Sequence, residues 1–172
     1  IFERKHLSVL LGIDIVILNK MIAMPDKFYY SFTIPKRNGQ KRTISAPYPA
    51  LLHIQKWIYN NLLLSQRLSE SAKGFVPNLN IADNARPHLN HTTVLKLDII
   101  DFFPTISKQR IIEVFRYMGY THGVAYALAS LCCKNSSLPQ GAPTSPYLSN
   151  IVAKRMDKRL MGLCEKFHIT YT

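Results

Sequence analysis

The sequence lacks an apolar run long enough to cross a membrane. Its most hydrophobic stretch, residues 9–18, is interrupted by Gly12 and Asp14, whereas a membrane-spanning helix needs about 20 consecutive apolar residues. Basic Arg4 and Lys5 precede this stretch, as basic residues do in a signal peptide, yet no small-residue cleavage site follows. We therefore expect a folded, cytoplasmic protein.

Cysteine is also scarce, which argues against a disulfide-rich fold and a cysteine-based metal site. Cys132, Cys133 and Cys164 are odd in number and lack the spacing of metal ligands. They indicate a reducing compartment, and the adjacent pair is expected to pack as small core residues in an apolar helix. His88 and His91 have no third candidate ligand nearby, so we expect structural or phosphate-contacting roles for them.

Glycine-rich nucleotide-binding fingerprints, internal repeats and a regular alternation of strands with helices are absent as well. These absences argue against a doubly wound nucleotide-binding fold and favour an α+β architecture. Capping residues and apolar positions at helical spacing predict helices that begin after Asp14, at Pro49, near Ile81, after Ser107, near Val124 and after Ser145.

Acidic residues are few, so the chain is strongly basic. The 22 Lys and Arg residues against 10 Asp and Glu give a net charge of +12 over 172 residues. Basic residues neutralise phosphates and release counterions, so nucleic acid is the first expected partner and an acidic membrane surface a weaker second. A solvated basic surface with no partner is the alternative.

The most clearly predicted local structure is a β-hairpin within residues 29–47. Two extended runs flank Asn38-Gly39, the dipeptide that most readily forms a two-residue hairpin turn. Such a turn would place Lys36 opposite Lys41 and Arg37 opposite Gln40. Like charges on opposite strands are unfavourable unless an anion lies between them, so the cationic tip is expected to bind phosphate. The alternative is a solvated strand edge protected by its lysines.

Residues 94–99 have the composition of a mostly buried strand that carries a carboxylate near its end. An unpaired charge in such a position is costly, and a divalent metal ion is the partner for Asp98 that also supports chemistry. A structural or capping role for Asp98 is the alternative. Asp101 is a less favoured ligand, because side chains alternate along a strand and three residues turn it to the opposite face.

The loop Leu138–Pro146 combines Gly141 with three prolines, a composition typical of rigid loops that approach ligands closely. Ser145 is predicted to cap a long helix with Pro146 at its first position, and a helix N-terminus favours a phosphate-bearing ligand. The amide of Gln140 could then contact a sugar or a base. An ordinary structured loop before a helix is the alternative.

Four segments resemble, in the right order, motifs of reverse transcriptases, in particular the bacterial enzymes of the retron and group II intron types. Tyr30–Arg42 is similar to the fingers hairpin, residues 73–85 to the motif before the first carboxylate, Val94–Ile106 to the first catalytic motif, and Leu138–Pro146 to the template and nucleotide loop. The resemblance runs from about Leu7 to the last residue, and the opening helix, the hairpin and residues 51–58 favour the retron type.

The resemblance implies the fingers and part of the palm of a right-hand polymerase: N-terminal helices, a fingers β-hairpin and a short antiparallel palm sheet packed by helices. The expected divisions are an N-terminal helix and fingers (1–90), the first palm strand with the catalytic motif (91–107), fingers and palm helices with a loop (108–141), and a palm helix with the start of the next strand (142–172). The Tyr-x-Asp-Asp turn that completes the family's metal site is absent, so these residues alone are expected to be inactive.

The resemblance also implies roles for individual residues. Asp98 would be catalytic and would bind Mg²⁺ beside the backbone of Ile99, and the complete enzyme would use two ions. Phe103 would pack under the sugar, where it would exclude a 2′ hydroxyl. The residues implied for nucleotide binding are Lys36, Arg42, Asp101, Phe102, Phe103 and Gln140, and those implied for nucleic-acid binding are Arg37, Lys41, Lys73, Arg86 and Gly141.

The implied activity is RNA-directed DNA polymerisation by two-metal nucleotidyl transfer. The expected partners are an RNA template, a DNA or RNA primer, deoxynucleoside triphosphates and the remainder of the polymerase chain, with a retron non-coding RNA and an effector protein in the retron case. Three alternatives stay open: a group II intron maturase, a catalytically inactive RNA-binding module, and a fragment that matters only for folding or assembly.

Overall fold

Polar residues at the predicted positions begin several helices. In the computed structural model, which describes residues 1–36 and 39–172, the Asp14 carboxylate accepts a hydrogen bond from the Val16 N–H (2.7 Å) at the start of α2 (Ile15–Ala23). Ser107 Oγ accepts one from the Arg110 N–H at the start of α6 (Lys108–Tyr117). A capping box between Asn80 and Asp83 begins α4 (Ile81–Ala85). Each cap satisfies N–H groups that have no partner inside the helix.

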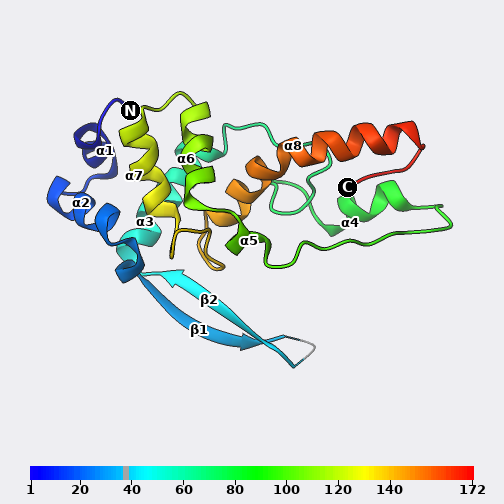
Figure 1. Ribbon diagram of the computed structural model, residues 1–172, viewed down its shortest axis with the longest axis horizontal. Coiled ribbons are helices and arrows are strands. Elements are labelled where there is room, and N and C mark those ends of the chain that lie inside the picture. The colour runs from blue at the N-terminus through cyan, green and yellow to red at the C-terminus, as the bar shows by residue number, and fades with distance from the viewer. Residues whose placement is uncertain (37–38) are drawn as a thin grey trace.

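Helices form the body of the molecule, and one β-hairpin projects from it (Figure 1). At the centre, α7 (His122–Cys132) contacts α1 (Arg4–Leu11), α2, α3 (Pro49–Ile58) and α6. The long α8 (Ser145–Lys166) extends away from this group of helices (Figure 1). The shorter elements are the 3₁₀ helices η1 (Pro25–Phe28) and η3 (Arg86–His88), the π-helical turn η2 (Tyr59–Leu63) that continues α3, and α5 (Phe102–Thr105).

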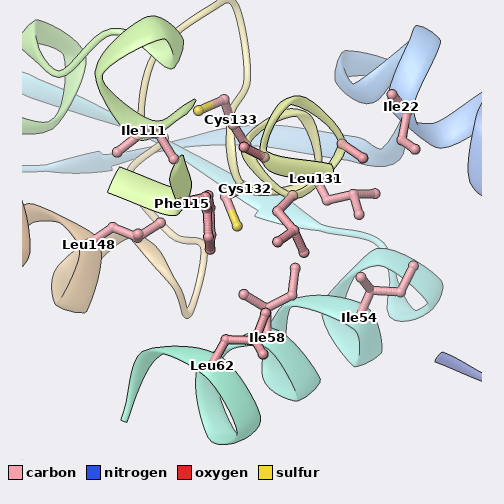
Figure 2. Packing of buried hydrophobic residues seen from close by; sticks show 14 of the residues in the cluster. Ile22, Ile54, Ile58, Leu62, Ile111, Phe115, Leu131, Cys132, Cys133 and Leu148 are labelled. Atoms are coloured by element: carbon pink, nitrogen blue, oxygen red, sulfur yellow. The ribbon is translucent and has the colours of Figure 1, made fainter. Parts of the chain in front are cut away.

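The core forms where apolar faces of α3 and α6 meet α7, which is buried on most sides. A helix that is apolar all round belongs in the interior of a protein. Figure 2 shows Phe115 of α6 beside Cys132, with Ile58 of α3 below them, and Phe115 is fully buried. Burial raises the pKa of the thiols of Cys132 and Cys133, that of Cys133 to about 12. Both thiols therefore stay protonated and serve as small core residues, as predicted.

Gln55 joins three elements inside this core. Its fully buried side chain donates from Nε2 to Tyr29 Oη (2.6 Å) and to the Leu131 carbonyl oxygen (2.7 Å). These bonds connect α3 to α7 and to the first residue of the hairpin. Burial raises the pKa of the Tyr29 phenol, so that the phenol stays neutral and hydrogen-bonded.

Gln55→Met is expected to lower the free energy of unfolding by about 1 to 2 kcal/mol, because two buried polar groups lose their partner. The loss stays moderate because Gln55 Oε1, which has no partner within residues 1–36 and 39–172, is removed as well. Urea unfolding followed by circular dichroism measures the change. Gln109→Met, on the exposed surface of α6, is the matched control, and equal stability of the two variants would contradict the role of Gln55.

The predicted hairpin is confirmed, but its predicted register is wrong. Strand β1 (Tyr29–Pro35) pairs antiparallel with β2 (Lys41–Pro47), and Pro35 lies opposite Lys41. The Lys36 N–H donates to the Gln40 carbonyl oxygen (2.7 Å), so the loop has three residues instead of two. Gly39 adopts a positive φ (78°), which closes three-residue hairpin loops without strain.

The register removes the predicted opposition of like charges. Arg42 lies opposite Ile34, and Lys36 pairs with Gln40 instead of Lys41. The predictions for Arg37 and Asn38 fall outside the residues that the structure describes. The cations of the hairpin still lie near its tip. The expectation of an anionic partner therefore depends on the number of these cations and on the residues around them, and no longer on like charges placed opposite each other.

The predicted buried strand at residues 94–99 is absent. This segment is extended, forms no strand and is exposed along its whole length, with Leu97 82% exposed. It runs beneath α8 from beyond α4 to α5 (Figure 1). A strand forms only where a neighbouring strand accepts its backbone hydrogen bonds, and β1 and β2 make the single sheet of the described residues. Residues 167–172, predicted as the start of a strand, form a turn at 167–168 and no strand.

The long helix begins close to the predicted position, although its cap differs. Pro146 lies in the first turn of α8, as predicted, but Thr144 precedes the helix and Ser145 is its first residue. The backbone is already helical at Thr144 (φ −81°, ψ −26°), whereas an N-cap residue normally has an extended backbone. Ser145 therefore cannot act as the predicted cap.

Among the described residues, no single helix has both the length and the apolar composition to span a membrane; α1 and α2 would meet these criteria only as a pair bent by 109°.

Candidate functional site

An open pocket of about 440 Å³ lies between the hairpin and the loop that follows α7. Strand β2 and the hairpin tip form one wall, and residues 134–140 form the other. The lining side chains that bear charge or an amide are Lys36, Lys41, Arg42, Lys134, Asp101, Asn135 and Gln140. The structure thus brings together five of the residues predicted for the nucleotide or the nucleic acid. Four lie on the hairpin and the loop, and the fifth is Asp101 of the central segment.

The pocket carries a marked excess of positive charge. Four cations line it against one carboxylate, that of Asp101. The ion pairs found in the described part of the chain are Arg86–Asp83 and Arg116–Glu113, so none of the pocket's cations is neutralised there by a carboxylate. A concave site lined by charge of one sign concentrates ligands of the opposite sign. The pocket is therefore suited to a ligand with several negative charges.

The loop reaches the hairpin through direct backbone contacts. The Ser45 N–H donates to the Gln140 carbonyl oxygen (2.7 Å), and both residues line the pocket. Gly141 adopts a φ of +119°, and a Cβ there would lie 2.8 Å from Ile44 Cγ2 and 2.9 Å from the Ser45 carbonyl oxygen. A glycine at this position allows the loop to approach β2 closely.

Gly141→Ala is expected to raise the Kd of the pocket for an anionic ligand by about tenfold, as measured by equilibrium titration, since ~1.4 kcal/mol of lost binding corresponds to this factor. The added methyl group would push the loop away from β2 and widen the pocket. Gly162→Ala is the control, because a Cβ there meets no atom within 4 Å. A Kd unchanged by Gly141→Ala would show that close approach of loop and strand is not required.

Lys134 is the pocket cation that sequence reasoning missed. Its Nζ donates to Ser31 Oγ (2.6 Å) and Ser45 Oγ (3.1 Å) on the hairpin. The sequence places Lys134 in a polar turn after the two cysteines, with no local signal that it reaches a strand about a hundred positions earlier. Only the tertiary arrangement reveals its place in the site.

Asp98, the predicted catalytic residue, does not line the pocket. It lies in the exposed segment at residues 94–99, with Ile99 45% exposed beside it. Asp101 does line the pocket, and its left-handed backbone (φ 49°) turns the chain from the extended segment into α5. Asp tolerates this conformation better than most residues. Phe102 and Phe103 of α5 are half-buried and pack against the core.

The remaining predicted contacts lie elsewhere. Arg86 forms an exposed ion pair with Asp83 (3.2 Å), Lys73 is half-buried, and neither lines the pocket. His88 and His91 contact Thr172 and Thr170 through their Nε2 atoms. These histidines connect the segment after α4 to the residues that follow α8, in keeping with a structural role.

Few carboxylates near the pocket could hold a metal ion. Asp101 lines it, Asp98 lies three residues earlier, and the described residues contain no group of three His, Cys, Asp or Glu side chains arranged for a metal ion. Magnesium is commonly bound by one or two carboxylates together with water and substrate phosphates. The residues present therefore fit an ion shared with a phosphate-bearing substrate, and they do not form a complete site for two ions.

Comparison with known proteins gives consistent matches. A family model described as Reverse transcriptase (RNA-dependent DNA polymerase) matches residues 34–172. The chain is 33% identical over 162 residues to Retron Ec86 reverse transcriptase of Escherichia coli, and the aligned region covers 93% of this chain and 51% of that protein. It is 36% identical over 164 residues to Retron Mx65 reverse transcriptase of Myxococcus xanthus, covering 85% of this chain and 38% of that protein. The chain thus spans about half the length, or less, of these curated relatives.

Proposed function

Because the chain belongs to the reverse transcriptase (RNA-dependent DNA polymerase) family, we propose that the full-length protein copies RNA into DNA and binds the incoming deoxynucleoside triphosphate in the pocket beneath the hairpin. The observation that carries this proposal is the set of four cations, Lys36, Lys41, Arg42 and Lys134, that line one pocket without a carboxylate partner among the described residues. A triphosphate supplies the several negative charges that such a pocket favours.

The hairpin and the loop would hold different parts of the nucleotide. Arg42 and Lys36 would bind the phosphates, because guanidinium and ammonium groups form strong charge-assisted hydrogen bonds with phosphate oxygens. Gln140 also lines the pocket, and its side-chain amide would contact the sugar or the base. The two walls together would orient the triphosphate before the reaction.

Enzymes of this family generally use divalent metal ions, and we propose that Asp98 and the backbone of Ile99 hold Mg²⁺, one of two ions in the complete enzyme. The ions would stabilise the attacking and leaving oxygens of an in-line displacement. Asp101 lines the pocket together with the four cations. Its carboxylate would offset part of their positive charge beside the nucleotide. Phe102 and Phe103 would pack beside the nucleotide, with Phe103 under the sugar, where it would exclude a 2′ hydroxyl.

The template and primer would extend beyond the pocket. The net charge of +12 supports binding to nucleic acid, since each neutralised phosphate releases counterions. Lys41, Arg37 and Gly141 are proposed to contact it near the hairpin, and Lys73 and Arg86 along the segment before residue 94. Because the relatives are named retron reverse transcriptases, a retron non-coding RNA is the template we favour over a group II intron RNA, with an effector protein as a further partner.

Primer extension by the protein at the full length of its relatives tests this proposal. We expect incorporation of deoxynucleotides on a DNA primer annealed to an RNA template in the presence of Mg²⁺. Tight RNA binding without extension would instead favour the non-catalytic RNA-binding alternative, for which the exposed position of Asp98 outside the pocket is the supporting observation.

A further inference from the structure

The turn Lys134–Ser137 is held rigidly on the body of the molecule. Lys134 and Ser137 exchange both backbone hydrogen bonds (2.9 and 3.0 Å). The Asn135 N–H donates to the Asp26 carboxylate (2.8 Å), and the Ser136 carbonyl oxygen accepts from the Lys108 N–H (2.8 Å). The turn is therefore attached to η1 on one side and to α6 on the other.

This turn is also conformationally costly. Asn135 (φ 48°) and Ser136 (φ 60°) both adopt left-handed backbone conformations. Asn tolerates this conformation, whereas Ser adopts it at a cost. Such strain persists where the surrounding structure fixes the backbone and often accompanies a functional constraint. Here the strained turn determines where the Lys134 side chain begins and which way it leaves the body.

From this fixed base, the Lys134 ammonium reaches a pair of hydroxyl groups on the hairpin. Ser31 and Ser45 lie opposite each other in the β1–β2 register, and their Oγ atoms are 3.0 Å apart. Lys134 Nζ donates to both, at 2.6 and 3.1 Å. One side chain thus connects the body to both strands of the hairpin.

Ser45 receives a second connection from the same wall of the pocket. Its N–H donates to the Gln140 carbonyl oxygen, so its backbone and its side chain are both bound to the segment 134–140. Arg42 is three residues away on the same strand, about 10 Å at the rise of a β-strand. The position of Arg42 over the pocket therefore depends on how firmly Ser45 is held.

We propose that Lys134 is a positioning residue that holds the hairpin over the pocket through Ser31 and Ser45 and thereby places Arg42 for the phosphates of the incoming nucleotide. This inference rests on the proposed function. Lys134 acts through the two serines, and its ammonium does not itself have to touch the nucleotide. Loss of the connection would let the hairpin swing and weaken substrate binding equally in the ground state and the transition state, which raises KM and leaves kcat unchanged.

The kinetic test uses full-length protein and compares Lys134→Met with the double variant Ser31→Ala/Ser45→Ala. Methionine keeps most of the length of the side chain but removes its donors, and the serine variant keeps the ammonium but removes its acceptors. We expect each to raise the KM for deoxynucleotides by about tenfold with kcat within about twofold of wild type. Combining all three changes should be no worse than either alone, because they break one connection. Lys134→Arg, whose guanidinium also carries enough N–H donors for both serines, should restore most of the affinity.

Direct phosphate binding by Lys134 gives a different pattern. In that case Lys134→Met would raise KM, while the serine variant would leave it unchanged or lower it, since the ammonium would be freed for the ligand. This pattern, or an unchanged KM in Lys134→Met, would overturn the positioning role. Both results require an active wild-type enzyme and therefore leave the proposed polymerase function intact.

Hydrogen–deuterium exchange tests the same connection without relying on activity. In full-length Lys134→Met without substrate, amides of β2 around Ser45 should exchange at least about fivefold faster than in wild type, because opening of the hairpin becomes easier. Amides of α6 and α7 should be unaffected. Unchanged exchange in β2 would overturn the inference even if the wild-type protein showed no polymerase activity, a result that would separately refute the proposed function.

Discussion

Replacing Asp98 by asparagine in the full-length protein is expected to lower the rate of primer extension at least about a thousandfold, or roughly 4 kcal/mol in activation free energy. The proposal assigns Asp98 as the carboxylate ligand of the divalent ion. Asparagine keeps the size and shape of the side chain but removes the charge that a hard cation requires. The measurement is single-nucleotide incorporation at saturating deoxynucleotide and Mg²⁺, with RNA-template binding measured in parallel.

The Asp98 prediction has a matched control on the exposed surface of α6. Glu113→Gln also exchanges a carboxylate for an amide, on the exposed face of α6 where Glu113 pairs with Arg116 (3.5 Å). This variant should retain wild-type activity and RNA binding. Equal rates for Asp98→Asn and Glu113→Gln would remove Asp98 from the mechanism and favour Asp101, the carboxylate that does line the pocket.

Arg42→Met should have the second-largest effect, a rise of about thirtyfold in the KM for deoxynucleotides. Hydrogen bonds to charged groups contribute about 1.5 to 3 kcal/mol, and the mid-range of ~2 kcal/mol corresponds to this factor. Methionine retains the aliphatic stem, so packing opposite Ile34 should be kept. Steady-state kinetics over a range of deoxynucleotide concentrations measures the change.

Arg116→Met, which removes an exposed guanidinium from α6, is the control for Arg42. It should change KM by less than about twofold, since exposed ion pairs contribute little. If both arginine variants showed the same small change, the hairpin would not hold the triphosphate. The cations of the pocket would then have to serve the template backbone instead.

Features set by neighbouring residues could be predicted from the sequence. Asp14 and Ser107 cap helices where expected, because a cap depends on one side chain and the N–H groups two or three residues later. Gly39 lies in a hairpin loop as predicted, because its positive φ is a local requirement. The resemblance to reverse transcriptases, inferred from four short segments, is confirmed by the family match over residues 34–172.

Features that depend on distant partners were not predictable in the same way. The hairpin register differs by one residue, because loop length is set by the whole pairing of the strands as well as by Asn38-Gly39. Residues 94–99 have the composition of a strand, yet composition cannot supply the neighbouring strand that would pair with them. Lys134 reaches Ser31 from the other end of the fold, a contact for which the sequence carries no pattern.

The central claim is that a nucleotide's phosphates bind among the cations between the hairpin and the 134–140 loop. A crystal structure of the full-length protein with an RNA template, a dideoxy-terminated primer, deoxynucleoside triphosphate and Mg²⁺ tests this claim most directly. We predict phosphate oxygens within hydrogen-bonding distance of the Arg42 guanidinium and the Lys36 ammonium. A triphosphate bound elsewhere, with this pocket empty or filled by template backbone, would contradict the account.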